Sequence, residues 1–291
     1  MKRFKKLIMC VMSAIMLLTC TIGLTGCGED IKKLELKFEV YNYEAGVTET
    51  HTMHVDLYRH LATKTVDTII GYVNDGYYNN LLVYKLGNEG SSQLMIGDIK
   101  YDLSNDQAKE NFGFYLNDIK PAIDGEFASG GTVGSNLKNT TGSIGLWRSW
   151  YAQDGTYSGN SNATDTGRAT WYIPTETISN YDGNFCVFAQ FDLEDEDNEA
   201  ALDALTLAFS SSEKYVNYVV YYTGEYDVTK VNENYGLEFH VLPQEEYNQI
   251  KDDLNAFEAK DDQLIQYNPS TIRVPFVHNE IGARLVSAKM A

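Results

Sequence analysis

The chain has 291 residues, a hydrophobic content of 43% and a formal net charge of −18 at pH 7. This length and apolar content suffice for one large domain or two small ones with a substantial core. A strongly acidic surface repels phosphate groups, so we expect neither nucleic-acid binding nor electrostatic adhesion to anionic lipid.

The first 27 residues have the composition of an export signal. Four basic residues within the first six positions precede an apolar run, residues 7–18, and the segment ends in Leu24-Thr25-Gly26-Cys27. This ending resembles the lipobox of bacterial lipoproteins, which implies that Cys27 is lipidated and becomes the mature N-terminus. The alternative is an uncleaved transmembrane anchor. Either way, we expect residues 28–33 to form a short tether and residues 34–291 to lie outside the cytoplasmic membrane.

Cysteine usage agrees with this division of the chain. Cys10 and Cys20 would leave with the signal and Cys27 would carry the lipid, so only Cys186 remains. An intramolecular disulfide is then excluded. Because Cys186 lies in an apolar strand-like pattern, we expect it to be a buried and inert thiol.

Two alternating runs open the exported part. Leu34, Leu36, Phe38 and Val40 share one face of a predicted strand, and residues 53–57 repeat the pattern. The intervening Glu44-Ala45-Gly46 predicts a turn, and hence an antiparallel hairpin.

The period then changes to that of a helix. Val66, Ile69, Ile70 and Val73 follow the spacing of an amphipathic helix. Thr63 is the predicted N-cap, and Gly76 is the predicted C-terminal stop.

The remainder reads as short strands with few helices, which is typical of a barrel or sandwich. We predict strands at residues 80–86, 93–96, 142–147, 171–173, 185–191, 214–222, 237–242 and 284–289, helices at 199–209 and 245–257, and loops at 128–135 and 153–167. The acidic run 192–197 suits a helix N-terminus better than a calcium site, because the EF-hand pattern is absent.

Eight blocks of sequence occur in a recognisable order. They are His54-Val55-Asp56-Leu57-Tyr58, Ala62–Val66, Val73–Leu81, Val83-Tyr84-Lys85-Leu86, Leu94-Met95-Ile96-Gly97, Gly142–Arg148, Ala169-Thr170-Trp171-Tyr172-Ile173 and Tyr181–Ala189. Together they resemble the cyclophilin family of peptidyl-prolyl cis/trans isomerases over residues 54–191. The resemblance implies a mainly β fold, a cyclophilin-like closed antiparallel β-barrel flanked by helices. It also implies an enlarged loop at 149–167 and an insertion at about 212–278.

The resemblance also implies a chemistry. Cyclophilins rotate the bond before proline, whose resonance barrier is about 18–20 kcal/mol. They use an apolar proline pocket and an arginine that donates a hydrogen bond toward the prolyl nitrogen. At the matching positions this chain has Lys85 for the arginine, as the candidate catalytic residue, and Gly97 for a glutamine. The remaining candidate substrate-binding residues are Met95, Trp147, Thr170, Tyr172 and Phe185.

Each of these positions also has a structural interpretation. Lys85 could be a solvated strand residue, and Met95 and Tyr172 could be ordinary core. Trp147 could pack against the 149–167 loop and close the groove. His51, His54 and His60 form no zinc pattern, so we expect no metal and no cofactor.

Two functions therefore stay open. One is a foldase, a peptidyl-prolyl isomerase acting on proline-containing peptides or exported unfolded proteins at the outer face of the membrane. The other is a non-catalytic peptide- or protein-binding lipoprotein on the same scaffold. We expect a lipid-anchored monomer in both cases.

Overall fold

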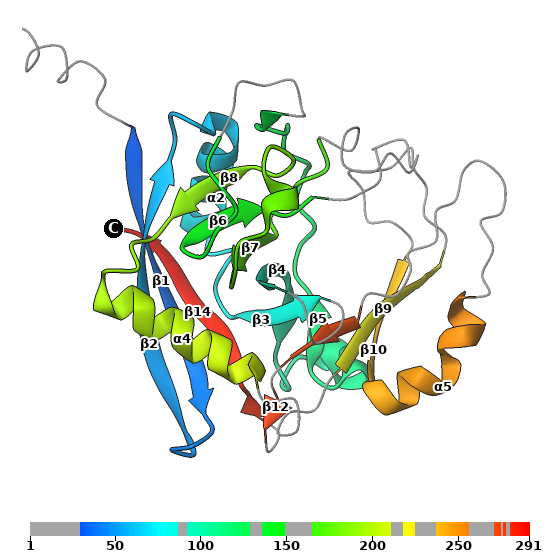
Figure 1. Ribbon diagram of the computed structural model, residues 1–291. Helices are drawn as coiled ribbons and strands as arrows, with labels where there is room; N and C mark the ends of the chain where they lie inside the picture. Colours follow the sequence, from blue (N-terminus) through cyan, green and yellow to red (C-terminus); the bar gives the residue numbers. More distant parts are fainter. Residues whose placement is uncertain are drawn as a thin grey trace, which may run out of the picture. The chain divides into compact units, whose positions relative to one another are not determined.

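The computed structural model describes residues 30–86, 92–128, 136–148, 165–210, 218–224, 237–255, 271–274, 276–277 and 280–291. Cys27 and most of the predicted loops 128–135, 149–167 and 153–167 lie outside these residues. Figure 1 shows the elements in chain order. They are β1 (Ile31–Asn42), β2 (Val47–Tyr58), α2 (Thr63–Asn74), β3 (Leu81–Leu86), β4 (Gln93–Tyr101), η1 (Asp106–Asn111), β5 (Phe114–Leu116), β6 (Ser143–Leu146), β7 (Trp171–Pro174), η3 (Ser179–Tyr181), β8 (Val187–Gln190), α4 (Glu196–Ser210), β9 (Tyr218–Gly224), β10 (Leu237–Pro243), α5 (Gln244–Asn255), β11 (Thr271–Arg273), β12 (Phe276–Val277), β13 (Glu280–Ile281) and β14 (Ala283–Met290).

Eight of the described strands close into an antiparallel ring. Its order is β3–β14–β1–β2–β8–β6–β7–β4, and β4 pairs again with β3. The C-terminal strand β14 completes the ring because it lies between β1 and β3. The predicted closed barrel with flanking helices and a closing strand near residues 284–289 is therefore confirmed. Within the described part of the chain, no helix is long and apolar enough to cross a membrane.

Further strands extend this ring on the outside. β5 pairs with β4, while β11, β9 and β10 continue the sheet in that order from β3. β9 to β13 and α5 all belong to residues 211–282, which connect α4 to β14. We refer to these residues as the 211–282 segment.

The barrel interior follows directly from the alternation of β1 and β2. Leu36 and Phe38 are fully buried, and Leu36 lies opposite Met53 of β2, which is fully buried too. The intervening Lys37 is exposed. Helices α2 and α4 add side chains to the same core, which include Val66, Ile69, Leu205 and Phe209.

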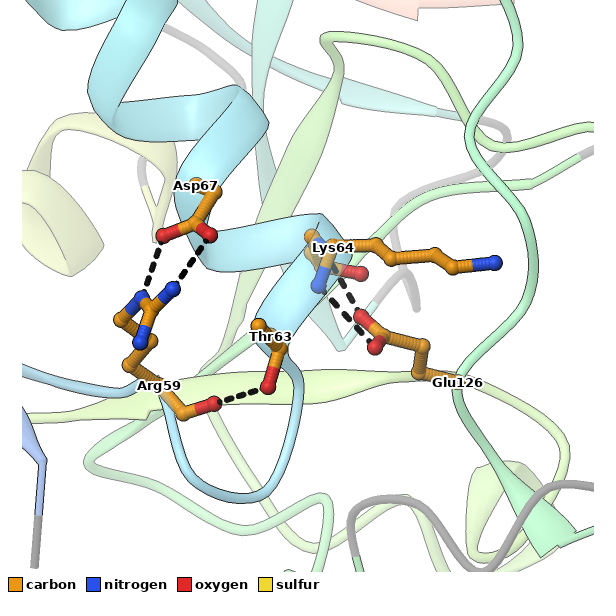
Figure 2. A network of polar contacts seen from close by, with 6 residues as sticks. Arg59, Thr63, Lys64, Asp67 and Glu126 are labelled. Carbon is orange, nitrogen blue, oxygen red and sulfur yellow. Dashed lines mark hydrogen bonds and ion pairs between the residues drawn. The ribbon is translucent and has the colours of Figure 1, made fainter.

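The start of α2 differs from the sequence prediction. The helix begins at Thr63 and the cap position is Ala62, so the prediction of Thr63 as N-cap is wrong. The Thr63 hydroxyl instead donates to the carbonyl of Arg59 at 2.9 Å. The carboxylate of Glu126 takes over the capping, since it accepts hydrogen bonds from the amides of Lys64 and Thr65 at 3.0 and 2.7 Å (Figure 2).

The end of α2 agrees with the prediction. The C-cap is Asp75, and Gly76 follows it with a φ of +71°. This left-handed conformation favours glycine, so Gly76 terminates the helix as expected.

Helix α4 begins three residues earlier than predicted, at Glu196. One carboxylate oxygen of Asp195 accepts hydrogen bonds from the amides of Asp197 and Asn198, at 3.0 and 3.2 Å. The acidic run therefore provides the helix cap, as the dipole argument predicted. Asn198 is buried and accepts a hydrogen bond from the amide of His54 at 2.6 Å, which fixes α4 to β2.

Cys186 has the predicted environment of an inert thiol. Its side chain is 2% exposed and lies 3.6 Å from the hydroxyl of Thr65. Burial raises the pKa of this thiol to about 12. Because only the thiolate is nucleophilic, Cys186 is unreactive in the folded protein.

Candidate functional site

Strands β4 and β7 present different side chains to their two faces. Leu94, Ile96 and Ile173 belong to the barrel core, whereas Met95 and Tyr172 belong to a second apolar cluster. Successive side chains of a strand point to opposite faces of the sheet. Met95 and Tyr172 therefore lie together on the outer face of the barrel wall, and Met95 pairs with Tyr172 across the two strands.

Four aromatic rings gather on this outer face. We call Trp147, Tyr172, Tyr181 and Phe185 the aromatic cluster. Tyr181 and Phe185 stack with ring centroids 4.3 Å apart, and Trp147 stacks on Phe185 at 5.6 Å. Tyr172 meets each of the other three rings edge-on, at 5.7 to 6.2 Å. These are the favoured geometries of aromatic pairs, so the rings stabilise one another.

The aromatic cluster is almost completely enclosed. Met95 and Tyr172 are 0% exposed and Phe185 is 1% exposed, while Trp147 is partly buried. With these exposures, Met95, Tyr172 and Phe185 offer no open surface on which a proline ring could lie.

The 211–282 segment belongs to the same apolar cluster of the outer face. Tyr218 and Val220 of β9, Val241 of β10 and Val274 belong to the same apolar cluster as Met95 and Tyr172. The ring of Tyr218 lies 5.1 Å from the ring of Phe114 in β5. A region between α4 and the closing strand therefore buries the β5 part of this apolar cluster.

The side chain of Asn111, at the end of η1, holds β10 in place. Its amide oxygen accepts a hydrogen bond from the backbone amide of Val241 at 3.0 Å, and its Nδ2 donates to the carbonyl of Phe239 at 3.3 Å. The side-chain amide thereby bonds to β10 as a neighbouring strand would. This contact ties the 211–282 segment to the loop between β4 and β5.

A chain of polar groups fixes the Tyr172 ring. Its hydroxyl donates to Oδ1 of the buried Asn139 at 2.5 Å. The backbone amide and Nδ2 of Asn139 donate to Asp182 at 2.9 and 3.1 Å, and the Lys138 ammonium lies 3.1 Å from the same carboxylate. Burial acts to raise the pKa of Asp182, but these hydrogen bonds and Lys138 outweigh it and hold that pKa below its usual value.

Burial raises the pKa of Tyr172 well above its usual value. The hydroxyl therefore stays neutral and remains a donor at physiological pH. It does not serve as a base in this environment.

Arg148 places a cation beside the aromatic cluster. The residue is 2% exposed, and its Nε donates to the carbonyl of Asn184 at 2.6 Å. Its guanidinium lies 4.9 Å from the centroid of Phe185 and 5.1 Å from that of Phe127. Burial lowers the pKa of Arg148, and Tyr172 partly opposes that shift. An arginine nevertheless keeps its charge in proteins, so these are cation–π contacts.

Comparison with known proteins assigns this fold to a family. The family described as "Cyclophilin type peptidyl-prolyl cis-trans isomerase/CLD" matches residues 46–215, which is more than half of the chain. The chain belongs to the cyclophilin family. The matched residues include the whole aromatic cluster, and they end before β9 begins.

Two solved structures of a Cryptosporidium parvum cyclophilin-type peptidyl-prolyl cis-trans isomerase are also similar. The first, determined in the presence of the dipeptide Ala-Pro, has 13% sequence identity and a TM-score of 0.34, and covers 57% of this chain and 84% of its own. The second has 14% identity and a TM-score of 0.33, and covers 59% and 83%. A search of curated proteins gave no match.

The structure does not bring Lys85 to the aromatic cluster. Along β3, Tyr84 belongs to the outer cluster and Val83 to the barrel core, so Lys85 shares the face of Val83. Lys85 is 8% exposed, and its ammonium lies 5.8 Å from the ring centroid of Phe209 in α4. Met95 and Tyr172 thus lie on the other side of the strand from Lys85.

Gly97 lies beside Thr170 at a point where β4 and β7 approach closely. A Cβ atom on Gly97 would stand 2.6 Å from both the Cα and the hydroxyl oxygen of Thr170. No side chain fits there without moving the backbone. The Thr170 hydroxyl instead donates to the Asp98 carboxylate at 2.5 Å. The close approach of β4 and β7 therefore leaves no room for a glutamine side chain at position 97.

The structure brings together four of the seven protein-site residues named from sequence, which are Met95, Trp147, Tyr172 and Phe185. Gly97 and Thr170 lie beside each other, and the Thr170 hydroxyl bonds to Asp98. Lys85 lies on the other face of the sheet, near Phe209. Sequence reasoning missed Tyr181, Asn139 and Arg148. Tyr181 and Arg148 were detectable, since Tyr181 opens one cyclophilin-like block and Arg148 ends another.

Among the described residues, no group of three His, Cys, Asp or Glu side chains lies close enough to hold a metal ion.

Proposed function

We propose that this chain is an extracytoplasmic, lipid-anchored cyclophilin-family protein that serves exported polypeptides by binding, with little or no isomerase turnover. The observation that argues against turnover is the enclosure of the outer face around the aromatic cluster, which we call the proline-site face. Met95, Tyr172 and Phe185 are at most 1% exposed, and Trp147 stacks over Phe185.

Catalysis of prolyl isomerisation depends on a donor beside a bound and twisted imide. Two of the donors that the family resemblance implies are altered here. Lys85 faces Phe209, and Gly97 has no room for a side chain. Losing one pre-organised donor commonly lowers a rate by about 10²–10³-fold. The combined changes argue against rapid turnover.

A second function, a residual isomerase, has one observation in its favour. Arg148 keeps a cation against the aromatic cluster, 4.9 Å from the Phe185 ring. If Trp147 moves aside, this guanidinium could meet a peptide bound on Met95 and Tyr172.

Isomerase activity decides between the two. The full chain, purified in detergent, should be tested on a short Xaa-Pro peptide beside an active cyclophilin and the Lys85→Ala variant. We expect wild type and variant to be equal, and both at least about 100-fold slower than the active cyclophilin. A rate close to that of the active cyclophilin, lost in Lys85→Ala, would contradict the proposal.

The membrane anchor has its own test. Cys27 follows Leu24-Thr25-Gly26 at the end of an export-like segment. Metabolic labelling with a palmitate analogue should mark wild type, and the Cys27→Ala variant should be unlabelled. Equal labelling of the two proteins would exclude Cys27 as the lipidated residue.

A further inference from the structure

A cavity of about 70 Å³ lies between the tip of the β1–β2 hairpin and the C-terminal half of α4. β1, β2 and α4 contribute nothing to the aromatic cluster, so this cavity is separate from the proline-site face. Its walls include Tyr41, Tyr43, Glu44, Glu49, His51 and Leu207.

The polar wall of the cavity is acidic. Asn42 donates from Nδ2 to one carboxylate oxygen of Glu49 at 3.0 Å, which orients that side chain. The other carboxylate oxygen lies 3.6 Å from Nε2 of His51. This Nε2 is buried and has no hydrogen-bond partner among the described residues. Glu44 adds a second carboxylate.

Helix α4 adds to the negative potential. Leu207 and Ala208 belong to its last turn, which contains no basic residue. The carbonyl groups at a helix C-terminus carry partial negative charge and favour cations. The carboxylates and the helix end therefore favour the same kind of ligand.

The remaining wall is apolar and aromatic. Tyr41 and Tyr43 meet edge-to-face with centroids 6.4 Å apart, and Ala204, Leu207 and Ala208 form the helix side. Such a wall suits a methylene stem, and tyrosine rings attract a cationic head group. A metal ion would instead require a shell of oxygen ligands.

The size of the cavity limits the ligand further. Sites for whole small molecules occupy about 300–1,000 Å³. A cavity of about 70 Å³ accommodates only the end of one side chain. We infer that this cavity binds the cationic side chain of a lysine or arginine presented by a polypeptide partner. The inference does not depend on whether the proline site is catalytic.

Ligand-observed saturation-transfer NMR tests this inference on the full chain in detergent. The probes are the acetylated amides of lysine, arginine and norleucine, because norleucine keeps the methylene stem without the ammonium. We expect transfer to the lysine and arginine side chains, and at least fivefold less to norleucine. Equal transfer to norleucine would overturn the inference, as would displacement of lysine by submillimolar calcium.

Variants localise the binding. Glu49→Gln should reduce transfer to lysine at least threefold, whereas Glu35→Gln, on β1 outside the cavity, should leave it unchanged. Leu207→Lys should abolish transfer, because it offers the cavity an ammonium from the chain itself. Leu207 is 55% exposed, so this change leaves the helix packing intact. Unchanged transfer in both Glu49→Gln and Leu207→Lys would overturn the assignment.

Discussion

The barrel interior and the outer face around the aromatic cluster are both buried, but different side chains and different parts of the chain bury them. The interior is mostly aliphatic and is closed by the barrel strands with α2 and α4. The outer face is aromatic, has polar contacts through Asn139 and Asp182, and is covered in part by the 211–282 segment. The interior therefore stabilises the barrel, whereas the residues that cover the outer face determine whether a peptide can reach Met95 and Tyr172.

The largest expected effect concerns the tight packing of the outer face. A Cβ on Gly145 of β6 would lie 2.3 Å from Cζ of Tyr172. We expect Gly145→Ala to displace the ring and to lower the free energy of unfolding by about 3 kcal/mol, measured by urea denaturation.

Gly71 of α2 is the matched control. A Cβ on Gly71 would have no atom within 4 Å, so Gly71→Ala should stabilise the protein by about 0.5–1 kcal/mol. A change of less than about 1 kcal/mol in Gly145→Ala would contradict the tight packing of Tyr172 against β6.

On the side of the barrel interior, we expect stability to depend on Glu126. Its carboxylate caps α2 by accepting hydrogen bonds from the amides of Lys64 and Thr65. Glu126→Ala leaves these donors without their acceptor and should cost about 2 kcal/mol of stability in the same denaturation experiment. Asp124→Asn removes only the exposed ion pair with Lys64 and should have no measurable effect. Equal effects of the two variants would contradict the capping role.

Asn111→Ala tests how the 211–282 segment is attached to the rest of the domain. It removes both hydrogen bonds to β10 and should cost about 1–2 kcal/mol of stability. Amide hydrogen exchange should rise in β9 and β10 and remain unchanged in β1 and β2. Faster exchange throughout the barrel would show that the segment and the barrel unfold as one unit.

Two carboxylates of the chain should also respond oppositely to pH. Desolvation raises the pKa of Asp98 in β4 above 3.8, so its ionisation costs stability as the pH rises through the folded-state pKa. The pKa of Asp182 is held below 3.8, so its stabilising contribution is present above that value and is lost as the pH falls.

Denaturation at pH 3 and pH 7 measures these contributions. Relative to wild type, Asp98→Asn should be more stable at pH 7 and Asp182→Asn less stable. Both differences should shrink toward pH 3. The same sign for both variants at pH 7 would contradict the assigned pKa directions.

Much of the fold could be predicted because local patterns determine it. The alternation of residues 34–40 fixed a core face, and Gly76 ended a helix that its apolar spacing had indicated. The capping of α2 by Glu126 could not be predicted, since Glu126 is 61 residues away in sequence from Thr65, whose amide it binds.

The site was harder to predict because both faces of β3 and β4 are apolar. Met95, Trp147, Tyr172 and Phe185 were found through the family resemblance, and the structure places them together. The face of Lys85 was ambiguous, because Val83 and Tyr84 are both buried and the sequence does not say which of them faces the barrel core. The cover supplied by Tyr218, Val220 and Val241 comes from beyond the family-like blocks, where no motif indicated contact.

Binding of a proline peptide tests the enclosed face most directly. A short Ala-Pro peptide should be titrated into the full chain, with saturation-transfer NMR as the readout, for wild type and for Trp147→Ala. The variant removes the ring stacked on Phe185 and leaves Met95 and Tyr172 in place. We predict no transfer to the proline ring with wild type and clear transfer with Trp147→Ala. Strong transfer with wild type that is unchanged in the variant would contradict the enclosure of this face.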